Sequence, residues 1–132
     1  NVALGGTLIR NIKPHLTADC GVTDFFGNTY SVLDGTPGVF THKNGVHKIT
    51  LEQNSRLAKV LGTETMVNSF HHQNIDRVAD GFVVSSWSED GLAEAIEKDK
   101  ILAVQWHPEQ SQTQADKKLF ERLITLCKGG DR

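Results

Sequence analysis

Alternation of apolar and polar residues predicts several strands in the chain. Residues 46–51 alternate with a period of two, which places His47, Ile49 and Leu51 on one face of a strand. Asp90-Gly91 is a turn signal, so the segments on either side of it are expected to form a hairpin. The expected strands cover residues 7–12, 46–51, 65–67, 82–87, 92–97 and 101–106.

The segment 101–106 differs from the other expected strands because it is a continuous apolar run. Its sequence, Ile-Leu-Ala-Val-Gln-Trp, is typical of a strand that is covered on both faces. We therefore expect it to be the most buried strand. Residues 13–40, in contrast, are weakly patterned and rich in turn-forming residues, which indicates a long loop.

Helical spacing appears in two places. Residues 55–61 carry apolar residues at helical spacing and end at Gly62. The stronger pattern covers residues 115–127, and Thr113 lies three residues before Asp116, as in a capping box. The apolar face of this helix is expected to comprise Ala115, Leu119, Phe120, Leu123, Ile124 and Cys127.

The chain opens as if inside a helix. Residues 1–4 resemble the last turn of a helix, and Gly5-Gly6 resembles its C-terminal stop. Because a single turn cannot nucleate alone, we expect this helix to begin upstream of Asn1. The whole chain, residues 1–132, is then one α/β domain that is truncated at its N-terminal side.

Composition excludes several classes of function. The 14 basic and 16 acidic residues give a formal net charge of −2, so charge offers no case for binding nucleic acid or a membrane. No apolar run approaches the roughly 18 residues that span a bilayer. Cys20 and Cys127 have no motif spacing, which excludes a disulfide framework. We expect a reduced, soluble, cytoplasmic protein.

The six histidines do not follow a known metal motif. His42 and His47 are five residues apart, and the adjacent His71 and His72 would diverge on a strand. We therefore expect no metal site and no cofactor. His47 is interpreted as a hydrogen-bonded histidine on a buried strand face.

The residues that carry chemistry follow the last apolar run. Pro108 favours an extended backbone at His107, and residues two apart on an extended segment point to the same side. The Glu109 carboxylate can then reach the His107 imidazole and stabilise its protonated form. This is a general base with its orienting group. The alternative is a surface histidine before a proline turn.

Five segments carry a resemblance to a known family: Asn1–Leu8, His47–Ile49, Val67–Gln73, Asp90–Glu97 and Gln105–Glu109. Together they resemble class I glutamine amidotransferases, in the γ-glutamyl hydrolase branch called peptidase C26. Gln105–Glu109 resembles the signature that closes the active site of those enzymes. Trp106, where synthase-linked amidotransferases commonly carry Phe, favours the γ-glutamyl-γ-aminobutyrate hydrolase type. The resemblance runs from Asn1 to about Cys127.

The resemblance implies the C-terminal part of a three-layer α/β/α, flavodoxin-like amidotransferase domain. It also implies that a cysteine thiolate attacks a γ-glutamyl amide, with His107 as the base and Glu109 as the orienter of the catalytic triad. Residues Ser69, Phe70 and His71 would face the glutamyl head group of a small-molecule substrate, through backbone atoms.

The nucleophile of that family lies in a G-x-C-x-G elbow before the segment that matches Asn1. Neither Cys20 nor Cys127 lies in such an elbow. One hypothesis is therefore an enzyme fragment whose activity needs a missing N-terminal half. The alternative is a catalytically inactive module that binds a partner or a γ-glutamyl ligand, with an exposed sheet edge that favours a homodimer.

Overall fold

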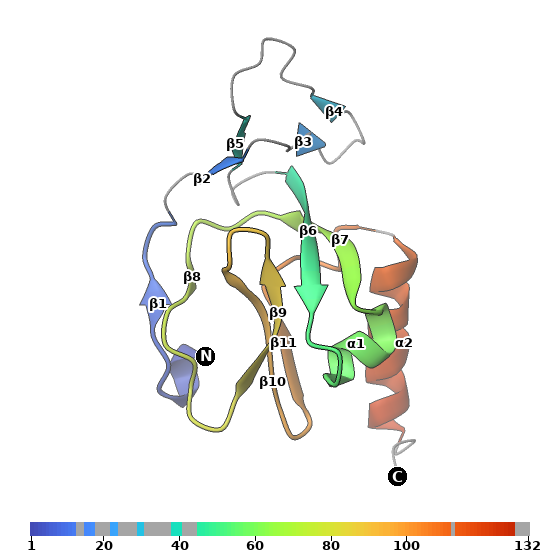
Figure 1. The fold of residues 1–132 in the computed structure, drawn as a ribbon. Helices are drawn as coiled ribbons and strands as arrows, with labels where there is room; N and C mark the ends of the chain where they lie inside the picture. Colours follow the sequence, from blue (N-terminus) through green and yellow to red (C-terminus); the bar gives the residue numbers. More distant parts are fainter. Residues whose placement is uncertain are drawn as a thin grey trace.

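The structure, a computed structural model, describes residues 1–12, 15–17, 22–23, 29–30, 38–40, 45–111 and 113–128. Its elements are shown in Figure 1. In chain order they are the 3-10 helix η1 (Val2–Leu4), β1 (Leu8–Ile9), β2 (His15–Thr17), β3 (Val22–Thr23), β4 (Thr29–Tyr30), β5 (Gly38–Phe40), β6 (Gly45–Leu51), α1 (Arg56–Leu61), β7 (Glu64–Ser69), β8 (Asn74–Ile75), β9 (Val83–Ser88), β10 (Ala93–Lys98), β11 (Ile101–Val104) and α2 (Gln114–Cys127).

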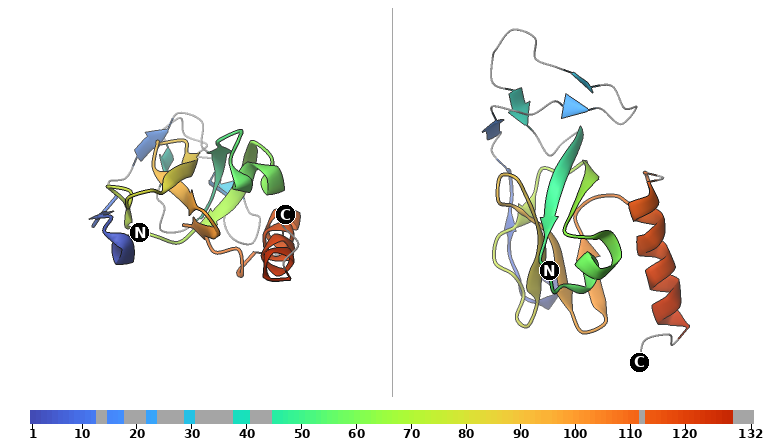
Figure 2. Two further views of the ribbon diagram at one scale, coloured as in Figure 1. Left: turned by 90° about the horizontal axis from the view of Figure 1, so that it is seen from below. Right: turned by 45° about the vertical axis from the view of Figure 1, so that its right-hand side comes forward.

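A curled antiparallel sheet forms the centre of the molecule. Its strands follow the order β11-β10-β9-β6, and β7 pairs with β6 along its whole length. The short β3–β4 pair joins the N-terminal end of β6. β1 pairs with β8, and β2 pairs with β5, in two separate two-stranded sheets. The views in Figure 2 show α2 standing beside this sheet, next to α1.

The hydrophobic core joins the sheet to α1. Ile49 and Leu51 of β6 are buried, as the alternation predicted, and His47 lies buried on the same strand. Trp106 is 3% exposed and belongs to the same cluster. Burial of such side chains is the main source of stability in a domain of this size. The cluster comprises Ile49, Leu51, Leu57, Ala58, Val67, Ala95 and Trp106, with partly buried Leu61, Leu102, Val104 and Leu119 packed against it.

Both helices begin with a side-chain cap, and the sequence predicted the one at Thr113. Ser55 caps α1 by accepting a hydrogen bond from the Ala58 amide. Thr113 and Asp116 form the full capping box at the start of α2. At the start of the chain, η1 is a single helical turn that ends at Gly5, whose φ of 94° is in the left-handed region.

Two burial predictions are wrong. β11 is exposed on alternate residues, with Ile101 48% exposed, and it lies at the edge of the sheet, whereas β10 is the most buried strand. On α2, Leu119 packs on the core, but Phe120, Leu123 and Ile124 are 42–54% exposed and Cys127 is also exposed. An apolar pattern indicates which side chains of a strand or helix are suited to burial. Within the described residues, no other element covers these faces.

The long loop expected over residues 13–40 is only partly tested. Where the structure describes this segment, it has the short strands β2, β3, β4 and β5. Pairings of two or three residues are too short to produce a periodic pattern in the sequence. The remaining residues, including Cys20, lie outside the described residues.

Among the described residues, no helix has both the length and the apolar character that crossing a membrane requires.

Two leucine substitutions test where the core lies. We expect Leu57→Ala to lower the free energy of unfolding by about 2–5 kcal/mol, because Leu57 is fully buried in the cluster and its loss leaves a cavity. Leu123→Ala, the matched control on the exposed side of α2, should cost about 0.5 kcal/mol or less. Urea unfolding of both variants measures this; equal losses would contradict the core as described.

Candidate active site

His107 and Glu109 form a hydrogen-bonded pair directly after β11. The distance from His107 Nδ1 to Glu109 Oε1 is 2.7 Å. Both side chains are accessible, with exposed fractions of 41% and 58%. A carboxylate only accepts hydrogen bonds, so His107 donates from Nδ1 and its Nε2 is left to exchange a proton with a reacting group. The spacing of two residues therefore brings the pair together as the sequence predicted.

The His107 ring changes the acidity of its partner. The hydrogen bond that it donates stabilises the charged carboxylate, and this lowers the pKa of Glu109 below its ordinary value of 4.5. Glu109 is therefore an anion at neutral pH, as an orienting group for an imidazole must be. An anionic partner also favours the imidazolium that forms when His107 takes up a proton.

The backbone of His107 is held by a side chain from β7. Asn68 Oδ1 accepts a hydrogen bond from the His107 amide at 2.8 Å, and Asn68 Nδ2 donates one to the His107 carbonyl at 2.7 Å. Asn68 is 3% exposed, so its amide is fixed. The sequence did not reveal this role, because the two residues are 39 positions apart. The segment Val67–Gln73 was the one signal in the sequence that could have located it.

Of the three residues expected to face the substrate, Phe70 contacts His107. Phe70 packs edge-on against the His107 ring, with the ring centroids 6.0 Å apart. Ser69 is fully buried at the end of β7, and the His71 side chain is buried as well, whereas the adjacent His72 is exposed. Phe70 therefore contacts the pair directly, while the side chain of His71 turns into the sheet.

Within the part of the chain that the structure describes, no cysteine lies beside the pair. Cys127 is an exposed residue at the C-terminal end of α2, and the segment that contains Cys20 lies outside the described residues. The arrangement therefore contains a hydrogen-bonded histidine–glutamate pair just after β11, and the sequence has no G-x-C-x-G elbow.

A second group of ionisable side chains lies inside the sheet. His47, His71 and Glu94 are all buried, and one ligand atom of each lies within 4.8 Å of the others. Among the described residues this is the group whose spacing suits a metal ion. The spacing of the histidines along the chain does not reveal it, because the three residues come from separate parts of the fold: His47 lies on β6, His71 follows β7 and Glu94 lies on β10.

Comparison with known proteins supports the same family as the motifs. The family model described as Peptidase C26 matches residues 1–109. This chain belongs to the peptidase C26 family. The match includes the strand end with His107 and Glu109 and the β7 segment that holds it.

Two relatives are longer than this chain. A Mycobacterium tuberculosis protein that carries the name glutamine amidotransferase is 39% identical over 132 residues, covering 98% of this chain and 37% of that protein. A Rickettsia prowazekii protein named glutamine amidotransferase-like is 31% identical over 157 residues, covering 97% of this chain and 56% of its own length. The chain thus spans about two-fifths to one-half of these relatives.

Solved structures show that the fold is that of glutamine amidotransferase domains. A glutamine amidotransferase from Thermotoga maritima superposes with a TM-score of 0.53 at 12% identity, covering 98% of this chain and 45% of that one. A GMP synthase-type protein from Thermoplasma acidophilum superposes with a TM-score of 0.66 at 18% identity, covering 97% of this chain and 51% of that one. The expected fold class, part of an α/β glutamine amidotransferase domain, is confirmed. All strand pairs of the described residues are antiparallel.

The lowered pKa of Glu109 gives a prediction that needs no substrate. The hydrogen bond from His107 favours the charged Glu109 carboxylate in the folded state. Its contribution to folding stability is therefore present above the ordinary pKa of Glu109, and it is lost as the pH falls through the lowered pKa of the folded state. In His107→Ala, we expect the pKa of Glu109 to rise toward 4.5. A carboxyl ¹³C NMR titration measures it, with His72→Ala as the control; an unchanged Glu109 pKa in His107→Ala would contradict the pairing.

Proposed function

We propose that this chain supplies the general base and its orienter to a cysteine-type γ-glutamyl amide hydrolase of the γ-glutamyl-γ-aminobutyrate hydrolase type. The observation that carries the proposal is the 2.7 Å hydrogen bond between His107 and Glu109 at a strand end that Asn68 holds in place. Membership in the peptidase C26 family supports amide hydrolysis as the kind of reaction.

In the proposed reaction, His107 Nε2 removes the proton of a cysteine thiol, and the thiolate attacks the γ-carbonyl carbon of the substrate. The C–N bond then breaks, and the imidazolium of His107 gives its proton to the leaving amine. Water, deprotonated by the same nitrogen, attacks the resulting thioester and releases glutamate and the free thiol. Glu109 keeps the Nδ1 proton of His107 directed away from the reacting atoms throughout.

The substrate's glutamyl group would lie against the segment Ser69–His71. Because the side chains of Ser69 and His71 are buried, this segment would bind the head group through backbone atoms, as the resemblance implies. Phe70 lies against the His107 ring and would limit the volume beside the scissile amide. Such apolar contacts and a few polar groups are usual in small-molecule sites.

The nucleophile would come from the part of the family domain that this chain does not span. Among the described residues, two surfaces are available for the packing of that part of the domain. β11 lies at the sheet edge with Ile101 exposed, and a hollow of about 420 Å³ separates η1 and β1 from β10 and β11. An uncovered edge with apolar side chains is a surface on which further strands pack.

The test uses the complete gene product and γ-glutamyl-γ-aminobutyrate. His107→Ala is expected to lower kcat by about 10²-fold or more, the usual effect of removing a general base. Glu109→Gln should cause a smaller loss, because the imidazole remains. Glu121→Gln on the exposed face of α2 removes the same charge away from the site and should leave kcat unchanged.

Two results would overturn the proposed function. One is a complete gene product that hydrolyses no γ-glutamyl amide. The other is a His107→Ala variant that keeps wild-type kcat. In the first case, the alternative of an inactive module that binds a γ-glutamyl ligand, as a homodimer through the β11 edge, would become the working hypothesis.

A further inference from the structure

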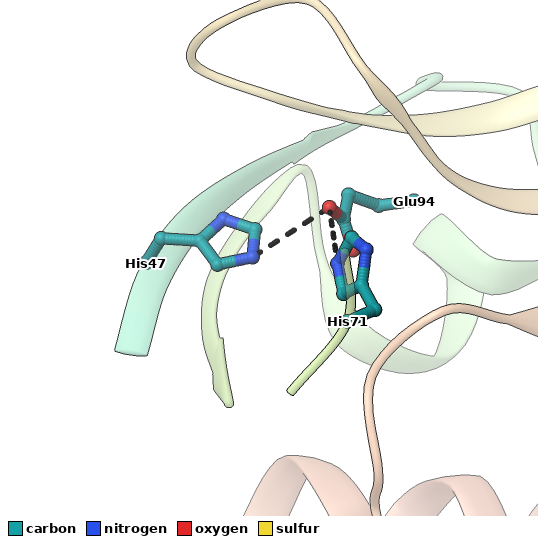
Figure 3. Close-up of side chains that lie close together, drawn as sticks. All are labelled: His47, His71 and Glu94. Carbon is teal, nitrogen blue, oxygen red and sulfur yellow. Dashed lines mark ion pairs between the residues drawn. The ribbon is translucent and has the colours of Figure 1, made fainter. Parts of the chain in front are cut away.

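The buried group formed by His47, His71 and Glu94 joins three separate parts of the sheet. His47 lies on β6, His71 follows β7, and Glu94 lies on β10. In Figure 3 both imidazole rings point toward the same oxygen of the Glu94 carboxylate. The Nε2 atoms lie 3.6 Å (His47) and 3.5 Å (His71) from Glu94 Oε1. The proposed reaction uses none of these three side chains.

A β-bulge places Glu94 in this position. Ala93 and Ala95 of β10 pair with the consecutive residues Trp87 and Ser86 of β9, so Glu94 is the extra residue between them. A bulge re-aims the side chain of its extra residue, and the Glu94 carboxylate is 0% exposed as a result. Burial of a carboxylate is costly unless cations, protons or hydrogen-bond donors surround it.

The hydrogen bonds of the two rings fix which nitrogen faces the carboxylate. His47 Nδ1 lies 3.2 Å from the Lys48 carbonyl, and His71 Nδ1 lies 2.9 Å from the Gln73 carbonyl. A carbonyl only accepts, so both Nδ1 atoms carry protons. In a neutral ring, Nε2 then presents a lone pair. A backbone carbonyl on the far nitrogen is the usual second partner of a metal-binding histidine.

The buried Nε2–Oε1 distances are longer than a charge-assisted hydrogen bond. A charge-assisted N–H···O bond is about 2.7–2.9 Å long, and the exposed pair of His107 and Glu109 has that length, 2.7 Å. The buried distances of 3.5 and 3.6 Å are longer. Two ligands bound at about 2.0–2.1 Å to a tetrahedral ion lie roughly 3.3–3.4 Å apart. The buried spacing is closer to that of ligands around a cation.

We propose that His47 Nε2, His71 Nε2 and Glu94 Oε1 bind one divalent first-row transition metal ion, of the Zn²⁺ class. Nitrogen and carboxylate donors at this spacing suit such an ion. The three ligands leave a fourth position to a water molecule. Because all three side chains are buried, the site is structural and does not meet the substrate.

The ion would stabilise the arrangement that holds the proposed base. His71 is three residues from Asn68, which binds the His107 backbone, and one residue from Phe70, which contacts the His107 ring. Tying His71 to β6 and β10 therefore fixes the end of β7 on which His107 depends. The metal proposal stands on the buried group alone and does not require the proposed hydrolase activity.

Metal content and cobalt spectroscopy test the site directly in the complete gene product. Elemental analysis of the purified protein should find about one Zn²⁺-class ion per chain. After removal with a chelator, one equivalent of Co²⁺ should produce the visible d–d bands of a four-coordinate site. Zn²⁺ at about 100-fold above its Kd should raise Tm by roughly 5–10 °C.

Glu94→Gln keeps the shape of the side chain and removes its charge. We expect its metal affinity to fall by at least about 10²-fold, since loss of an outer-shell partner alone costs about 10–100-fold. Glu97→Gln is the matched control, because Glu97 is a buried glutamate of the same strand outside the cluster, and its affinity should stay at the wild-type value. Circular dichroism checks that each variant folds.

¹⁵N-histidine NMR of the wild-type protein gives a result even if a variant fails to fold. Metal addition should shift the Nε2 resonances of two histidines while both keep a proton on Nδ1. The proposal is overturned if stoichiometric Co²⁺ or Zn²⁺ causes no spectral change, or if Glu94→Gln binds metal as tightly as Glu97→Gln. If only hydrogen bonds and ion pairs join the three side chains, metal addition would cause no spectral change. Neither result depends on whether γ-glutamyl amides are hydrolysed.

Discussion

The side chain of Asn68 connects β7 to the segment after β11 that carries His107 and Glu109. It bonds both the amide and the carbonyl of His107, which satisfies two backbone groups just beyond the last strand. Asn68 itself is held by β7, which pairs with β6 along its length. The position of His107 is therefore tied to the sheet through Asn68, in addition to the local turn in which the Gln110 amide donates to the His107 carbonyl at 3.1 Å. The same short segment of β7 carries Phe70 to the imidazole ring.

Two histidine–glutamate arrangements in one small structure differ in exposure and spacing, and the difference separates their roles. His107 and Glu109 are open to water and lie at hydrogen-bond distance, which suits proton transfer to a reacting group. His47, His71 and Glu94 are buried and lie farther apart, which suits an enclosed ion. Both arrangements meet at the end of β7, so the buried one can support the exposed one.

Local patterns in the sequence were sufficient for most of the elements. The alternation over residues 46–51 predicted β6 and its buried face, and Thr113 with Asp116 predicted the start of α2. The spacing of two residues likewise predicted the His107–Glu109 contact. These features depend on residues that are close in the chain.

Features that depend on distant residues were missed or wrong. The contact of Asn68 with His107 spans 39 positions, and the bulge at Glu94 depends on its register with β9. β11 was expected to be covered on both faces, but its apolar run specifies what it would bury and not what is present to cover it. The expected burial of Cys127 was wrong for the same reason: helical spacing placed it on an apolar face that is exposed here.

The central claim is that this chain holds the base of a cysteine hydrolase whose nucleophile lies outside these 132 residues. Labelling the complete gene product with an electrophilic glutamine analogue, followed by peptide mass spectrometry, tests it most directly. We expect one labelled cysteine, in a G-x-C-x-G elbow outside this sequence, with labelling that slows in His107→Ala. A label on Cys20 or Cys127 would contradict this claim, because the nucleophile would then lie within this chain.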